Sequence, residues 1–99
     1  MLNISKNTDG SELIIQLEGR LDTSTSPELE GELKSSLDGI SSLVIDIADL
    51  QYISSAGLRV LLSAQKIMNK QGTMVIKNTS EEVKEIFDVT GFSDILTIE

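Results

Sequence analysis

Residues 49–62 read DLQYISSAGLRVLL. This pattern predicts the end of a strand, a short loop that carries Ser54 and Ser55, and the start of a helix. Backbone N–H groups and the helix macrodipole favour negative charge at such a helix start. A phosphate on Ser55 would add about 1.5 to 2 negative charges at a point that tolerates them. The simpler interpretation, which the pattern alone favours, is that one of the two serines only caps the helix.

Short apolar runs alternate with helical patterns on both sides of this stretch. Strands are expected at 2–6, 13–17, 43–48, 74–76 and 95–98, and helices at 26–39, 55–70 and 80–91. Ser26 suits an N-cap and Pro27 the first helical turn. The order ββαβαβαβ predicts a single α/β domain, residues 1–99, with a mixed β-sheet and right-handed crossover helices.

The composition excludes several classes of function. The net charge is −8, which opposes direct binding to nucleic acid or to an anionic membrane surface. The chain contains neither cysteine nor histidine, which removes thiol nucleophiles, zinc sites of Cys or His, and Ser-His-Asp chemistry. We find no Gly-rich phosphate loop or paired acid–base motif, so we expect no enzyme activity and no cofactor. The absence of a signal-peptide pattern and of a long apolar run favours the cytoplasm and no membrane insertion.

Three further features have both a functional and a structural interpretation. Gly57 indicates either a close approach to the helix backbone or a helix that starts later, because glycine is unfavourable inside a helix. Arg59, four residues after Ser55, could reach a phosphate there or lie on a solvated surface. Asp22, Asp46 and Asp49 are more typical of turns and caps than of metal ligands, so we assign no metal site.

Several motifs along the chain resemble the STAS domain family, the anti-sigma factor antagonists of bacteria. The resemblance rests on SSAGL at 54–58, GRLDT at 19–23, VIDI at 44–47, VKEIF at 83–87 and TGF at 90–92. It implies that Ser55 is the phosphoacceptor and that Asp22 helps a partner kinase to engage. The partner-binding surface would then comprise Asp22, Thr23, Ser54, Ala56, Gly57, Leu58 and Arg59. The chain departs from the family at Ser54, where Asp is common, and at Ala56, where a second hydroxyl residue is common.

The resemblance also implies a partner-switching mechanism. The unphosphorylated protein would bind a GHKL-type serine kinase that doubles as an anti-sigma factor. Phosphorylation of Ser55 would release it, and a PP2C-type phosphatase would restore the binding form. The free protein is expected to be a monomer.

Two alternatives remain at this point. One is a STAS adaptor that is not phosphorylated and serves as a subunit of a transporter or signalling assembly; Ser54 in place of Asp keeps it open. The other is a receiver-like domain with Asp46 or Asp49 as phosphoacceptor. It is the weaker one, because the acidic pair and the lysine that such domains need are missing from the sequence.

Overall fold

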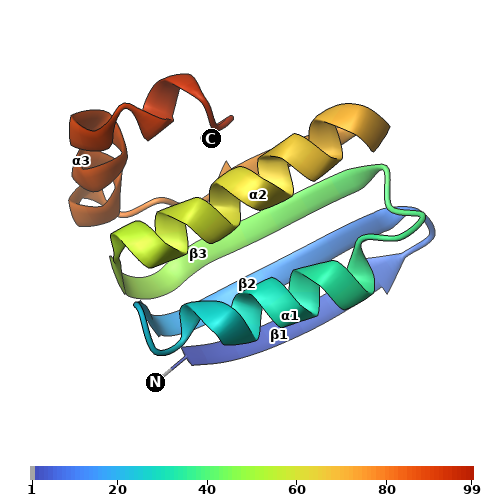
Figure 1. Ribbon diagram of the computed structural model, residues 1–99, viewed down its shortest axis with the longest axis horizontal. Coiled ribbons are helices and arrows are strands. Elements are labelled where there is room, and N and C mark those ends of the chain that lie inside the picture. The colour runs from blue at the N-terminus through green and yellow to red at the C-terminus, as the bar shows by residue number, and fades with distance from the viewer. Residues whose placement is uncertain (1) are drawn as a thin grey trace.

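The computed structural model describes residues 2–99 and contains four strands, three α-helices and one short 3₁₀ helix in that range. Along the chain they are β1 (Leu2–Asp9), β2 (Glu12–Leu21), α1 (Ser26–Ser36), β3 (Ser42–Ile53), α2 (Ser55–Gln71), β4 (Thr73–Lys77), α3 (Glu81–Thr90) and η1 (Phe92–Asp94) (Figure 1).

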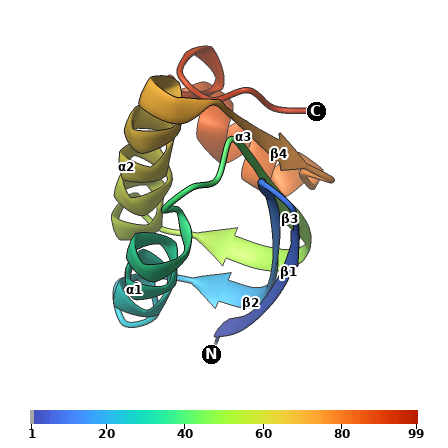
Figure 2. The ribbon, with the colours of Figure 1, turned by 90° about the vertical axis from the view of Figure 1, so that its right-hand side faces the viewer.

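The four strands form one mixed sheet in the order β1-β2-β3-β4. β1 pairs with β2 antiparallel, whereas β2–β3 and β3–β4 are parallel pairs. Each parallel pair requires a crossover, which α1 and α2 provide. Because right-handed crossovers that advance in one direction stay on one side of a sheet, both helices cover the same face, as Figure 2 shows. The receiver-like alternative is therefore wrong, since doubly wound folds of that kind have the strand order 2-1-3-4-5.

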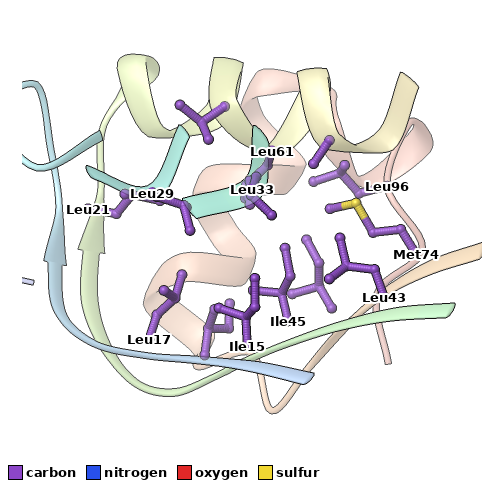
Figure 3. Close-up of a cluster of buried hydrophobic side chains, with 14 of the residues drawn as sticks. Ile15, Leu17, Leu21, Leu29, Leu33, Leu43, Ile45, Leu61, Met74 and Leu96 are labelled. Carbon is purple, nitrogen blue, oxygen red and sulfur yellow. The ribbon is translucent and has the colours of Figure 1, made fainter. Parts of the chain in front are cut away.

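The core lies between this face of the sheet and the helices. Alternate residues of β2, among them Ile15 and Leu17, are fully or almost fully buried. Figure 3 shows them beneath Leu33 of α1 and Leu61 of α2. Phe87 of α3 belongs to the same cluster and is fully buried. One continuous core thus holds all three α-helices on the sheet.

The expected last strand at 95–98 is wrong. The 3₁₀ helix at residues 92–94 is followed by a turn at 95 and 96, and only an isolated bridge between Ile76 and Ile98 remains. Two hydrogen bonds make this bridge, from the Ile76 amide to the Thr97 carbonyl at 2.9 Å and from the Glu99 amide to the Ile76 carbonyl at 2.8 Å. The turn thus takes the first half of the expected strand out of the sheet.

β3 extends beyond the expected strand at 43–48. The sequence pattern did not reveal the extension, because the β2–β3 register is irregular there. Ile47, Leu50 and Ile53 are all buried although they are three residues apart. The β2–β3 register shifts twice, between Gln16 and Glu18 and between Gly19 and Arg20. Such bulges let residues at odd spacing face the same side of a sheet, which a strict alternation cannot predict.

The ends of α1 also differ from the prediction. Thr25, not Ser26, occupies the N-cap position, without a side-chain capping bond. The Ser26 hydroxyl instead donates to the Asp22 carbonyl oxygen at 2.5 Å. The helix ends at Ser36 rather than near Gly39.

Candidate functional site

Two loops meet where β2 and β3 end. Leu21 pairs with Ile53 at the last position of both strands. Just beyond, the Ser54 amide donates to the Leu21 carbonyl oxygen at 2.8 Å. The loop that starts at Asp22 therefore lies beside the start of α2. The carboxyl ends of parallel strands are the usual place for binding sites in open α/β sheets.

The start of α2 separates the roles of the two serines. Ser54 is the N-cap, and its hydroxyl accepts from the Gly57 amide at 3.4 Å. Ser55 is the first helical residue and is exposed. Within residues 2–99 its hydroxyl makes no hydrogen bond, and the amides of Ser55 and Ala56 have no acceptor. The capping interpretation thus holds for Ser54 and not for Ser55.

The electrostatics of this helix start suit an anion. The first turn of α2 contains no acidic residue, although the chain as a whole carries a charge of −8. Free amides and the positive end of the macrodipole are therefore not offset by a carboxylate of this turn. A negative group on Ser55 would be accommodated here without loss of the helix.

Gly57 lies inside the first turn of α2, so a later helix start is wrong. A Cβ at this position would lie 2.7 Å from Cγ of Leu21 and 2.9 Å from Cγ1 of Ile53. The close approach comes from the core of the protein itself. Gly57 and Leu58 are both buried. They can therefore influence the binding of a partner only by setting the position of α2.

The loop of Asp22 is held by its own side chains. The Asp22 carboxylate accepts from the amide and the hydroxyl of Ser24, at 3.1 and 2.9 Å, and from the Thr25 amide at 3.1 Å. The Ser24 hydroxyl and the Thr25 amide thereby lower the pKa of Asp22 below its ordinary value. Thr23 is exposed at the tip of this loop.

Arg20 and Tyr52 form a neighbouring pair that the sequence analysis missed. The Arg20 guanidinium lies 4.5 Å from the centre of the Tyr52 ring, and its Nε lies 3.8 Å from a carboxylate oxygen of Asp22. The two residues are partners in the β2–β3 register. Only the shifted register brings them together, so no short motif could have identified them.

A hollow of about 210 Å³ lies between the start of α1 and the start of α2. Thr23 and Pro27 line one side, and Ala56, Arg59 and Val60 line the other. Arg59 is exposed and makes no ion pair within the described part of the chain. Predicted partner-binding residues from both loops thus share one surface beside Ser55.

The remaining aspartates have structural contacts. Asp46 accepts from the Ala48 amide at 3.0 Å and from the Asn78 side chain at 3.1 Å. Among residues 2–99, no group of three or more acidic residues is arranged to hold a metal ion.

A model of the STAS domain matches residues 3–99 of this sequence. The chain belongs to the STAS domain family. BtrV, a Bordetella bronchiseptica protein named as an anti-sigma factor antagonist, is 39% identical over 88 residues, which cover 87% of this chain and 76% of BtrV. The family assignment made from the sequence motifs is confirmed.

Two solved structures confirm the fold. An anti-sigma factor antagonist from Mycobacterium paratuberculosis superposes with a TM-score of 0.89 at 18% identity, over 99% of this chain and 85% of that one. The phosphorylated form of the Bacillus cell fate determinant SpoIIAA gives a TM-score of 0.76 at 14% identity, over 98% of this chain and 91% of SpoIIAA.

The family model and BtrV place the chain among the anti-sigma factor antagonists, which are non-enzymatic regulators, so the expectation that it is not an enzyme is confirmed. Within the described residues, no helix is both long and apolar enough to span a membrane.

Proposed function

We propose that this STAS protein is an anti-sigma factor antagonist of the cytoplasm that switches partners through phosphorylation of Ser55. In the unphosphorylated form it binds a GHKL-type serine kinase that also acts as an anti-sigma factor. A PP2C-type phosphatase removes the phosphate and restores binding. The observation that carries the proposal is the exposed, unbonded hydroxyl of Ser55 at the first position of α2.

The surroundings of Ser55 support a switch that leaves the fold intact. Capping is the task of Ser54, so modification of Ser55 removes no helix cap. The free amides and the missing acidic residue in the first turn offset part of the added charge. A partner surface docked over the same helix start would meet that charge directly. Repulsion from acidic groups and the cost of desolvating a phosphate would then weaken the complex.

The relatives add support from outside the chain. BtrV carries the name of an anti-sigma factor antagonist, and SpoIIAA is a protein of this fold described in a phosphorylated form. Ser54 stands where the family often has Asp, and its hydroxyl performs the capping that a carboxylate can also provide.

The proposal can be tested with the purified protein, ATP and each GHKL-type kinase of the same genome. Intact-mass and peptide spectrometry should find one phosphate, on Ser55, in the wild type and in Ser35→Ala, which removes an exposed hydroxyl of α1. Ser55→Ala should remain unmodified, and Ser55→Asp should bind the kinase more weakly than Ser55→Ala. A phosphate on another residue, or binding that Ser55→Asp leaves unchanged, would contradict the switch.

The second candidate is a STAS adaptor that is not phosphorylated. Its support is Ser54 itself, since the residue before the acceptor lacks the carboxylate common in the family. Tight binding to a partner with no phosphate transfer by any kinase of the genome would favour it.

A further inference from the structure

We propose that the hydroxyl of Thr25 and the carboxylate of Asp22 act together as positioning groups for the partner kinase. They fix the loop of residues 22–26 so that Thr23 and the hollow beside Ser55 are presented in one shape. In this view Asp22 does not contact the kinase through its charge. The inference rests on the proposed function of Ser55 and extends it to a residue, Thr25, that no motif indicated.

Thr25 is the buried centre of the loop. Only 7% of the residue is exposed. Its hydroxyl donates to the Arg20 carbonyl oxygen at 2.8 Å and accepts from the Asp22 amide at 2.9 Å. One side chain thus connects the end of β2 with the turn that follows it. A buried hydroxyl that uses both its donor and its acceptor is costly to remove, because the backbone groups lose their partners.

The Asp22 carboxylate is already occupied within the chain. One oxygen accepts from the amide of Ser24, the hydroxyl of Ser24 and the amide of Thr25. The other faces Nε of Arg20 at 3.8 Å. A carboxylate with this set of donors is a turn-forming group. A partner that approached it would have to displace bonds that hold the loop.

Backbone hydrogen bonds connect this loop to the start of α1, and the residue before the loop to the start of α2. The Ser26 amide at the start of α1 donates to the Asp22 carbonyl oxygen at 2.8 Å. The Ser54 amide before α2 donates to the Leu21 carbonyl oxygen at 2.8 Å. Thr23, exposed at the loop tip, therefore has a fixed place opposite Arg59 across the hollow. Loss of the bonds of Asp22 or Thr25 would release Thr23 while leaving Ser55 in place.

A double-mutant cycle in the kinase reaction separates positioning from direct contact. The variants are Asp22→Ala, Thr25→Val and the combination, with Asp22→Asn and Thr25→Ser as the rescues and Ser35→Ala as the control. We expect Asp22→Ala and Thr25→Val each to raise KM by roughly tenfold with kcat little changed. The double variant should be no worse than either single one, because both changes release the same loop. Thr25→Ser should behave like the wild type, and so should Asp22→Asn, because the amide oxygen of Asn can accept the same bonds.

Amide hydrogen exchange supplies a readout that needs no kinase. Asp22→Ala and Thr25→Val should both speed exchange at Ser24 and Thr25, while amides in the middle of α2 keep their protection. This pattern also shows that the variants remain folded, so a raised KM cannot be attributed to global unfolding.

Several results would overturn the inference. A Thr25→Val protein with unchanged KM would mean that Thr25 does not position the loop for the kinase. A double variant with multiplied effects, or an Asp22→Asn protein as impaired as Asp22→Ala, would mean that Asp22 contacts the kinase directly. A different result would contradict the proposed function: the wild type would bind the kinase but carry no phosphate on Ser55. In that case the same cycle measured on Kd decides the inference, which stands only if the effects on Kd are not additive.

Discussion

Gly57 shows how a single missing Cβ fixes the position of the helix that carries Ser55. The residue sits in the first turn of α2, where the side chains of Leu21 and Ile53 fill the space that a larger residue would need. These two residues end β2 and β3, so the glycine lets the helix start rest directly on the strand ends. This contact therefore sets how far the start of α2, and with it Ser55, projects from the strand ends.

Gly57→Ala should destabilise the protein by about 1 to 3 kcal/mol through overpacking, despite the better helix propensity of alanine. Gly31→Ala in α1 is the matched control, because a Cβ there meets nothing within 4 Å. It should stabilise the protein by about 0.5 to 1 kcal/mol. Urea unfolding measures both values. Equal effects of the two substitutions would mean that the contact with Leu21 and Ile53 does not limit the helix position.

The lowered pKa values of two aspartates allow us to predict how the free energy of unfolding depends on pH. The Ser24 hydroxyl and the Thr25 amide lower the pKa of Asp22, and the Ser93 hydroxyl lowers the pKa of Asp88, with a further contribution from Lys84. A carboxylate with a lower pKa in the folded state stabilises the fold above its unfolded pKa, and this contribution is lost as pH falls through the folded value.

We therefore expect the unfolding free energy to decrease from about pH 4 downward. The double substitution of Asp22 and Asp88 by Asn should make this decrease less steep, since both groups then no longer titrate. Urea unfolding at a series of pH values between about 6 and 2 measures the slope. An unchanged slope would show that these two carboxylates do not contribute to it.

At the scale of the elements, the start of α2 combines a cap with an open site. Ser54 caps the helix, and the next residue is left free. α3 begins in the same way, since the Ser80 hydroxyl accepts from the Val83 amide at 3.3 Å. The two helices therefore allow capping to be compared at a helix with the candidate site and at one without it.

Ser54→Ala and Ser80→Ala should each lower the unfolding free energy by about 1 kcal/mol, because each removes a side-chain cap. Only Ser54→Ala should also slow phosphorylation of Ser55, since the first turn of α2 would then fray. Ser54→Asp should keep the cap and the stability of the wild type. Denaturant titrations and the kinase assay provide the two measurements. A kinase effect of Ser80→Ala would show that general stability, and not the local cap, controls the reaction.

At the scale of the whole molecule, one core connects the sheet to every α-helix. Phe87 is fully buried and ties α3 to the cluster beneath α1 and α2. Val89, two residues further along α3, is 80% exposed. The site at the start of α2 therefore depends on the stability of the entire domain.

Phe87→Ala should cost about 3 to 5 kcal/mol, a large share of the stability of a domain of this size. Val89→Ala should change it by no more than about 0.5 kcal/mol. Circular dichroism and the fluorescence of Tyr52 should report coincident transitions, because one core unfolds as a unit. A separate transition of α3 would contradict a single cooperative core.

The sequence predicted the fold well where periodic patterns are strong. The short apolar run in β2 and the helical spacing in α2 identified these elements and their order. It failed where local geometry departs from a period. The register shifts of β3 hid the strand beyond residue 48, and the turn before Leu96 replaced the last strand. The pairing of Arg20 with Tyr52 was missed for the same reason.

The sequence by itself determined the family, the class of function and the position of Ser55 at a helix start, because motif, composition and periodicity are local properties of the chain. Only the tertiary structure decided that Ser54 is the cap, that Gly57 is packed by Leu21 and Ile53, and that the Asp22 carboxylate is occupied by its own loop. These facts depend on contacts between separate strand ends and on which hydrogen-bond partners each side chain reaches in the folded chain.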